Sequence, residues 1–203
     1  MTAEDILAFW FADAEDDPSK AEQRSAFWFK SQRETDELIK QRFAPAVRDA
    51  GRGLFSDWES QPRSRLALII LLDQFPRNIY RGTPAAFQYD TQALDLTRRG
   101  IAAGHLWTLA TVEQAFMLMP FQHVEDLAAQ REGMMLFERM LERAAPEWRS
   151  FAEGIVKYAR MHLELVERFG RFPHRNAILG RASTPAEEEY LRSHSESFGQ
   201  KAP

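Results

Sequence analysis

One carboxylate of this 203-residue chain falls inside its most apolar segment, where a charged group needs a reason to be present. Asp73 follows the run LALIILL and shares a helical register with Leu66, Ile69 and Ile70. A carboxylate on such a face is either a general base or metal ligand, or one half of an internal ion pair. Arg77 lies four residues further on, at the spacing of helical neighbours, so both interpretations stay open.

Three further side chains have the chemistry to work with Asp73. His162 shares a helical stripe with apolar residues, and Glu113 lies between Leu109 and Phe116, so both are expected to point inward. His123 comes just after a proline, near the predicted start of the next helix. General acid–base catalysis uses such pairs of imidazole and carboxylate, whereas an isolated inward histidine is more often a satisfied core residue. The candidate catalytic residues are Asp73, Glu113, His123 and His162.

Side chains that carry several N–H donors, mainly those of arginine and asparagine, are concentrated after two Phe-Pro pairs. Arginine and asparagine in such a cluster bind a carboxylate or phosphate when they face one cavity. Alternatively, they bond the carbonyl groups at helix ends and hold the turns in shape. The candidate ligand-binding residues are Arg77, Asn78 and Arg81 in the first segment, and His174, Arg175 and Asn176 in the second.

Other kinds of chemistry are disfavoured by what the sequence lacks. It contains no cysteine, which excludes disulfides and thiolate ligands, and no motif typical of serine hydrolases, phosphate-binding loops or zinc proteases. The histidine–glutamate pairs two residues apart point to different helix faces, so no metal site and no cofactor are predicted. A net charge of −4 argues against nucleic-acid binding.

Helices are expected to position all of these side chains. Proline, glycine and capping residues delimit apolar stretches of helical period throughout, and no alternating strand pattern is present. Thr2 with Asp5 three residues later is predicted to cap the first helix, and Asp17 before Pro18 is predicted to start the second. No apolar run is long enough to span a membrane, and the N-terminus lacks a basic leader, so a cytoplasmic protein is expected. The predicted helices cover about 3–13, 18–31, 32–50, 62–75, 84–100, 108–119, 124–144, 147–169 and 185–193, with a polar tail after about 194.

The two Phe-Pro segments resemble each other beyond that pair. Each continues to Arg-Asn, then a glycine, then Thr-Pro at a predicted helix start, at an offset of about 100 residues. Internal similarity in an all-helical chain indicates a helical-repeat architecture.

Three blocks of the sequence resemble a known family. They are LDQFPRNIYRGTPAAF (72–87), MPFQHVEDLAAQ (119–130) and RFGRFPHRNAILGRASTPAEEEYL (168–191). They are similar to signature blocks of a bacterial family of uncharacterised proteins, domain of unknown function 924, and the resemblance covers about residues 3–192. It implies a tetratricopeptide-like fold but no activity. Where the family has serine after the histidine, this chain has Val124, which argues against a hydroxyl function there.

Together these patterns predict one all-α domain over residues 1–203, built of antiparallel helix pairs in a right-handed superhelix. The first functional hypothesis is a binding module that holds a peptide, a protein partner or a small anionic molecule in a concave groove. The second is a small hydrolase-type enzyme with histidine–carboxylate chemistry and arginine anion binding, and the third is a structural subunit. The hydrolase hypothesis requires a histidine and a carboxylate within hydrogen-bond reach at an open cavity.

Overall fold

A computed structural model of the chain describes residues 1–193, and the predicted polar tail lies outside them. These residues form nine α-helices and five short 3-10 helices, without any strand, which confirms the all-helical prediction. The α-helices are α1 (Ala3–Phe11), α2 (Pro18–Phe29), α3 (Arg33–Gly51), α4 (Pro62–Ile79), α5 (Asp90–Ala102), α6 (Thr111–His123), α7 (Leu127–Arg143), α8 (Arg149–Phe169) and α9 (Pro185–Ser193).

Local sequence signals start several of these helices as predicted. At α1, the hydroxyl of Thr2 accepts from the backbone N–H of Asp5, and the Asp5 carboxylate accepts from that of Thr2. This reciprocal pair satisfies two N–H groups that the first turn leaves without partners. The side chain of Asp17 caps α2, and Pro18 occupies its first turn, where a missing N–H costs nothing.

Two prolines were predicted to end helices and do not. Helix α4 continues through Pro76 to Ile79, and α6 continues through Pro120 to His123. Each proline lies in the last turn, where one lost backbone hydrogen bond is tolerated because the helix is about to end and packing holds it. The first Phe-Pro-Arg-Asn segment is therefore the end of a helix and not a loop.

Another prediction fails between the first Phe-Pro segment and α5. The Thr-Pro pair at 83–84 was expected to open one long helix, but it opens a single 3-10 turn, Pro84–Phe87. The α-helix begins only at Asp90, after a short break. Similarly, Thr108 ends a 3-10 turn, and α6 begins at Thr111.

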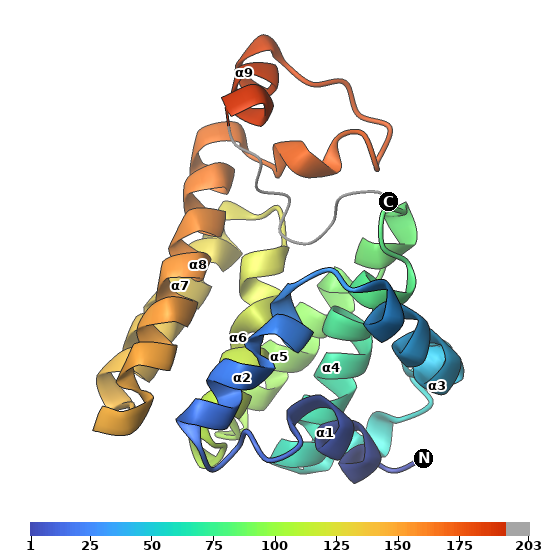
Figure 1. Cartoon of the computed structure of the whole chain (residues 1–203), viewed down its shortest axis with the longest axis vertical. Helices are drawn as coiled ribbons and strands as arrows, with labels where there is room; N and C mark the ends of the chain where they lie inside the picture. The colour runs from blue at the N-terminus through green and yellow to red at the C-terminus, as the bar shows by residue number, and fades with distance from the viewer. Residues whose placement is uncertain (194–203) are drawn as a thin grey trace.

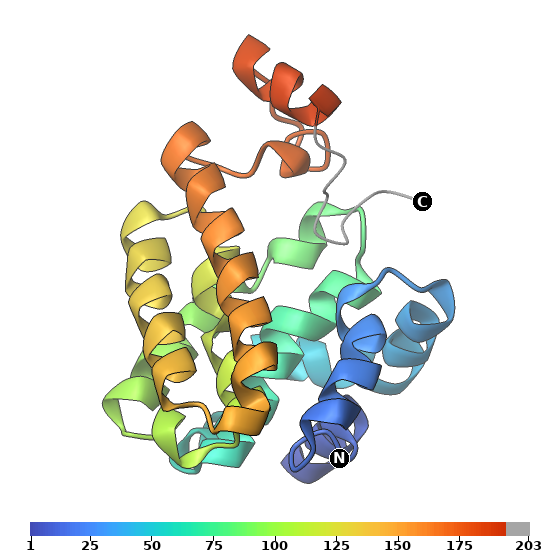
Figure 2. The same cartoon turned by 60° about the vertical axis from the view of Figure 1, so that its left-hand side comes forward.

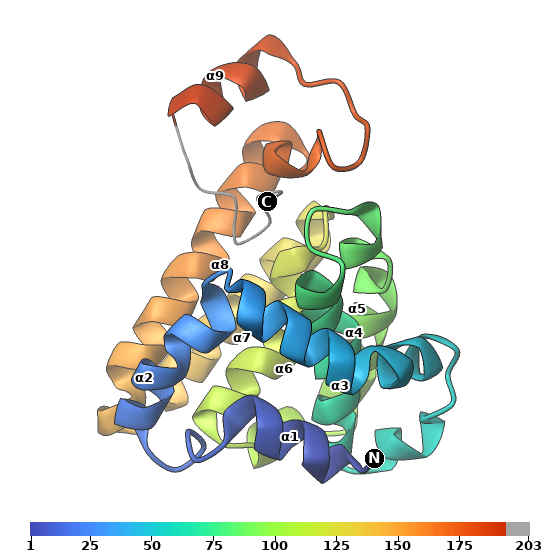
Figure 3. The same ribbon diagram turned by 45° about the vertical axis from the view of Figure 1, so that its right-hand side comes forward.

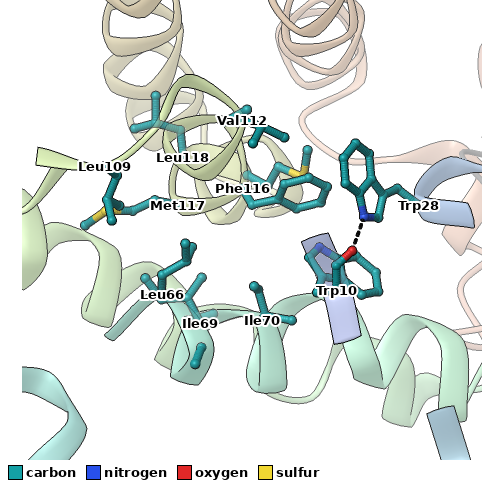
Figure 4. Close-up of a cluster of buried hydrophobic side chains, with 14 of the residues drawn as sticks. Trp10, Trp28, Leu66, Ile69, Ile70, Leu109, Val112, Phe116, Met117 and Leu118 are labelled. Atoms are coloured by element: carbon teal, nitrogen blue, oxygen red, sulfur yellow. Dashed lines mark hydrogen bonds between the residues drawn. The ribbon is translucent and has the colours of Figure 1, made fainter. Parts of the chain in front are cut away.

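Helix α4 occupies the centre of the molecule, as its nearly continuous apolar sequence predicts. It packs against α1, α3, α5 and α6, and its inward side chains meet those of α6 in the cluster of Figure 4. Aromatic rings from the N-terminal helices complete this cluster. Trp10 lies edge-on to Phe116, and the indole N–H of Trp28 donates to the carbonyl of Trp10 at 2.9 Å.

Helices α7 and α8 lie side by side along one flank of the molecule (Figures 1 and 2). The chain then turns into the second Phe-Pro segment and α9, which cover the far end of α8 with a small apolar cluster of their own. The right-handed superhelix stays a prediction. None of the helices within residues 1–193 combines the length and apolarity needed to cross a membrane.

Candidate functional site

A cavity of about 270 Å³ opens between α2, α4, α6 and α8. Its walls combine aromatic and aliphatic side chains with amides, two imidazoles and three cationic groups. Among the described residues, every charged side chain that lines it is a cation. The lining residues are Trp28, Phe29, Lys30, Gln74, Arg77, Asn78, Arg81, Met119, Gln122, His123, Ile155, Tyr158 and His162.

The C-terminal part of α4 and the end of α6 bring a buried carboxylate next to an imidazole that lines this cavity. Asp73 Oδ1 lies 2.8 Å from His123 Nδ1, although the two residues are 50 positions apart in the chain. The Asp73 side chain is completely buried, and that of His123 retains 12% of its accessible surface. The criterion of a histidine and a carboxylate in hydrogen-bond reach at a cavity is therefore met by this pair.

Asp73 is held as an anion by its surroundings. Burial by itself would raise the pKa of its carboxyl group, but the charges of His123 and Arg77 and the hydrogen bonds from His123 and Gln74 lower it to about 2. Arg77 Nη1 lies 3.5 Å from Asp73 Oδ1 and donates to the Asp73 backbone carbonyl at 2.6 Å. The predicted ion pair with Arg77 thus exists alongside the shorter bond to His123.

The surroundings of both imidazoles at the cavity lower their pKa and so favour the neutral form. Burial lowers the pKa of His123, the charge of Arg77 lowers it further, and Asp73 only partly opposes them. Burial also lowers the pKa of His162 well below its usual value. Since the Asp73 carboxylate can only accept, His123 Nδ1 carries the proton and Nε2 carries the lone pair. A neutral imidazole in this tautomer is equipped to act as a general base.

His162 faces His123 from α8, with the two ring centres 6.0 Å apart. Its Nδ1 donates to the backbone carbonyl of Tyr158 at 2.8 Å, which explains how the imidazole is held within a helix. His162 therefore lines the cavity rather than forming part of a fully packed core. No group of three or more histidine, cysteine or acidic side chains within residues 1–193 is arranged to hold a metal ion.

A chain of buried charges links the cavity to the second Phe-Pro segment. Asp90 accepts two hydrogen bonds from Arg77, at 2.8 and 2.9 Å, and its Oδ2 lies 3.5 Å from Arg175 Nη1. One carboxylate thus compensates two buried guanidinium groups. Arg175 is also enclosed by the rings of Phe87 and Phe172, whose centres lie 4.3 and 4.5 Å from its guanidinium carbon.

The cationic side chains at the cavity differ in whether a carboxylate of the protein already pairs with them. Arg81 forms a two-pronged ion pair with Asp36, at 2.6 and 2.7 Å, and Arg77 forms one with Asp90. Asn78 donates to the same Asp36 at 2.8 Å. Lys30, at the end of α2, is exposed and makes no ion pair with any residue in the range 1–193. It is therefore the cation with charge left for a ligand.

The second Phe-Pro segment does not line the cavity, in contrast to the first. Arg175 reaches the charge chain through Asp90, while Asn176 donates to Ser183 Oγ at 3.0 Å and accepts from Arg181. Burial, followed by the charge of Arg175, lowers the pKa of His174 to about 3. Asn176 therefore makes its hydrogen bonds within its own loop. This is the arrangement expected if the arginine and asparagine side chains hold the turn in shape instead of binding an anion.

Glu113 lies away from Asp73 and His123 and is not part of the cavity wall. It is the third residue of α6, where its carboxylate accepts from the backbone N–H of Ala110 at 2.9 Å and pairs with Arg63. Burial raises its pKa, and the bond from Ala110 and the charge of Arg63 oppose that effect. The structure gives this residue a helix-capping position.

Several lining residues were missed in the sequence. Trp28 and Tyr158 line the cavity from α2 and α8, and neither was predicted as a site residue. Gln122 and Gln74 each adjoin a singled-out residue, and Gln122 Oε1 is buried without a hydrogen-bond partner among the described atoms. In the sequence, the one signal that could have identified these two glutamines as lining residues was that each adjoins a member of the Asp73–His123 pair.

The low pKa of His174 leads to an acid-stability prediction. An unfolded histidine binds a proton below about pH 6.5, whereas folded His174 does so only near pH 3, so stability falls as the pH decreases through this window. Between pH 7 and pH 5, the native protein is expected to lose about 2 kcal/mol more unfolding free energy than the variant His174→Gln. Urea unfolding at both pH values measures this, and equal losses would contradict it.

Comparisons with known proteins identify relatives of the whole chain. The sequence model of a family described as "Bacterial protein of unknown function (DUF924)" matches residues 6–195. A solved structure of a protein of unknown function from Agrobacterium tumefaciens is 34% identical, with a TM-score of 0.79, over 95% of this chain and 97% of that one. Among curated proteins, no match is found.

Proposed function

This chain belongs to the DUF924 family, and we propose that it is an enzyme that binds a small, singly charged anion in the cavity and uses His123 as a general base. The observation that carries this proposal is the Asp73–His123 hydrogen bond at the wall of a cavity with only cationic charged residues. Asp73 would hold the imidazole in the tautomer with an available Nε2 and stabilise its protonated form.

The charge balance favours a ligand with one negative charge. Arg77 and Arg175 are offset by Asp90 and Asp73, and Arg81 is offset by Asp36. This leaves the single positive charge of Lys30 at the cavity. A carboxylate matches that charge better than a doubly charged phosphate, because excess negative charge in a partly buried site is not compensated. The aromatic walls would hold an apolar part of the same molecule.

The lining residues also favour water as the nucleophile. Within residues 1–193 they include no serine, threonine or cysteine, so none of these described side chains is available at the cavity to form a covalent intermediate. In this mechanism, His123 Nε2 takes a proton from water while the oxygen bonds to the carbonyl carbon of a bound ester or amide. The protonated imidazole then donates that proton to the leaving group as the bond to it breaks.

Two chromogenic esters test this proposal, since they differ in one carboxylate. Mono-4-nitrophenyl succinate carries the anion, and 4-nitrophenyl butyrate lacks it. The protein is expected to hydrolyse the succinate ester faster, with the rate lost in His123→Gln and the KM raised about fivefold or more in Lys30→Gln. The matched controls His105→Gln and Lys157→Gln, which lie outside the cavity wall, should retain native rates.

Two other outcomes would show whether the anion site or the catalytic role of His123 is wrong. If butyrate, which carries one negative charge, quenches the tryptophan fluorescence in a Lys30-dependent way but neither ester is hydrolysed, the general-base role is wrong and a binding protein remains. If butyrate does not bind, the anion site itself is wrong.

A further inference from the structure

A second hollow continues from the cavity along the boundary between α2 and α8, which lie beside each other in Figure 3. This outer cleft has a volume of about 540 Å³, within the range of about 300 to 1,000 Å³ typical of ligand pockets. It shares Phe29, Lys30, Ile155 and Tyr158 with the inner cavity. The two spaces therefore form one elongated site with Lys30 at the junction.

The sign of the charged residues changes along this elongated site. The inner cavity has cations only, whereas the outer cleft has Glu22 on the α2 side and Glu147 just before α8. Neither glutamate makes an ion pair with another residue between 1 and 193. A ligand that spans both spaces is thus matched by a negative group at its inner end and a positive group at its outer end.

Hydroxyl groups and a glycine line the cleft between these ends. Ser25 and Ser150 offer donors and acceptors suited to the amides of an extended chain, and Ser19, whose hydroxyl donates to Asp17, offers an acceptor. Gly154 lies within α8 at the cleft, where a Cβ atom would meet nothing within 4 Å. Glycine disfavours a helix relative to alanine, and no contact in the structure requires it at this position.

We propose that the cleft between α2 and α8 is a second subsite, which holds the amino end of a short peptide whose carboxylate end occupies the inner cavity. A peptide with free ends carries one charge of each sign and amides between them, as the lining requires. This proposal rests on the proposed function for the inner end and adds the identity of the substrate class.

Three forms of one peptide test the proposal by titration of tryptophan fluorescence. They are tetra-alanine with both ends free, with an acetylated N-terminus, and with an amidated C-terminus. We expect the free peptide to bind best, the acetylated form to bind about fivefold more weakly, and the amidated form to bind at least tenfold more weakly. In the double variant Glu22→Gln/Glu147→Gln, the free and acetylated peptides should bind equally.

The matched control is Glu37→Gln/Glu142→Gln, which removes two exposed carboxylates elsewhere and should preserve the native order of affinities. If acetylation has no effect on the native protein, the outer subsite is wrong. Binding of the monoanion butyrate separates this failure from failure of the inner site. Butyrate that binds while the peptide ends make no difference overturns only the subsite, whereas butyrate that does not bind overturns the anion site on which it rests.

The variant Gly154→Ala provides a second test. Its expected result, weaker peptide binding in a more stable protein, differs from that of a variant that fails to fold. The substitution is expected to raise the melting temperature by about 2–4 °C, because alanine favours the helix. It is also expected to weaken tetra-alanine binding several-fold by narrowing the cleft, with butyrate binding unchanged. A stabilised variant that binds the peptide as well as the native protein would contradict occupation of the cleft.

Discussion

Replacement of Asp90 by alanine is expected to destabilise the protein by about 3–5 kcal/mol. Asp90 is buried and is the shared partner of Arg77 and Arg175, so its loss leaves two buried guanidinium groups without their nearest opposing charge. A cation in an apolar environment is costly unless it is paired. The first turn of α5 also loses the carboxylate that complements its dipole.

Equilibrium urea unfolding of the native protein and two variants measures this effect. Asp95→Ala, at an exposed position of the same helix, is the matched control and should change the free energy of unfolding by no more than about 0.5 kcal/mol. Asp90→Asn keeps an acceptor but removes the charge, and it should fall between the two. A cost below about 1 kcal/mol for Asp90→Ala would show that water, and not Asp90, compensates the two arginines.

The variant Asp73→Asn is expected to reduce any hydrolysis of the succinate ester by about 10²- to 10⁴-fold. The asparagine amide can donate to His123 Nδ1, which would move the imidazole proton to Nε2 and remove the lone pair required of the base. Butyrate binding should not weaken by more than about threefold, because Asp73 itself does not line the cavity and its replacement removes no positive charge. A loss of kcat with little change in affinity would identify a positioning role for the carboxylate.

Long-range ¹H–¹⁵N spectra of the two imidazole nitrogens report the tautomer independently of turnover. In the native protein the Nδ1 signal of His123 should be that of a protonated nitrogen and the Nε2 signal that of a lone pair, and Asp73→Asn should reverse them. Asp95→Asn is the matched control, with native spectra and native rates. An unchanged tautomer in Asp73→Asn would contradict the role of Asp73 in holding the imidazole.

The local structure of this protein was readable because its causes are local. The Thr2–Asp5 capping box, the Asp17-Pro18 helix start and the central helix were all predicted from spacing alone. Each depends on residues within one or two turns of one another, which capping chemistry and hydrophobic period describe. The failures at Pro76 and Pro120 occurred where packing between helices outweighs the local preference of proline.

The candidate site could be predicted only in part, because it depends on contacts between residues far apart in the chain. The period of α4 placed Asp73 on a buried face, and a buried carboxylate needs a partner. The sequence could not say which partner, because Arg77, His123 and His162 all had suitable chemistry. The two Phe-Pro segments also looked equivalent, although only the first lines the cavity.

The sequence by itself determined that the chain is helical, where most helices begin, and that Asp73, His162 and Glu113 point inward. Only the tertiary structure decided that the end of α6 meets the end of α4, so that His123 reaches Asp73 across 50 residues while Glu113 remains at the other end of α6. Helix formation follows from neighbours in the chain, whereas the meeting of two helix ends follows from how their surfaces pack. That packing also brings Lys30 to the mouth of the cavity, where its charge is available for a ligand.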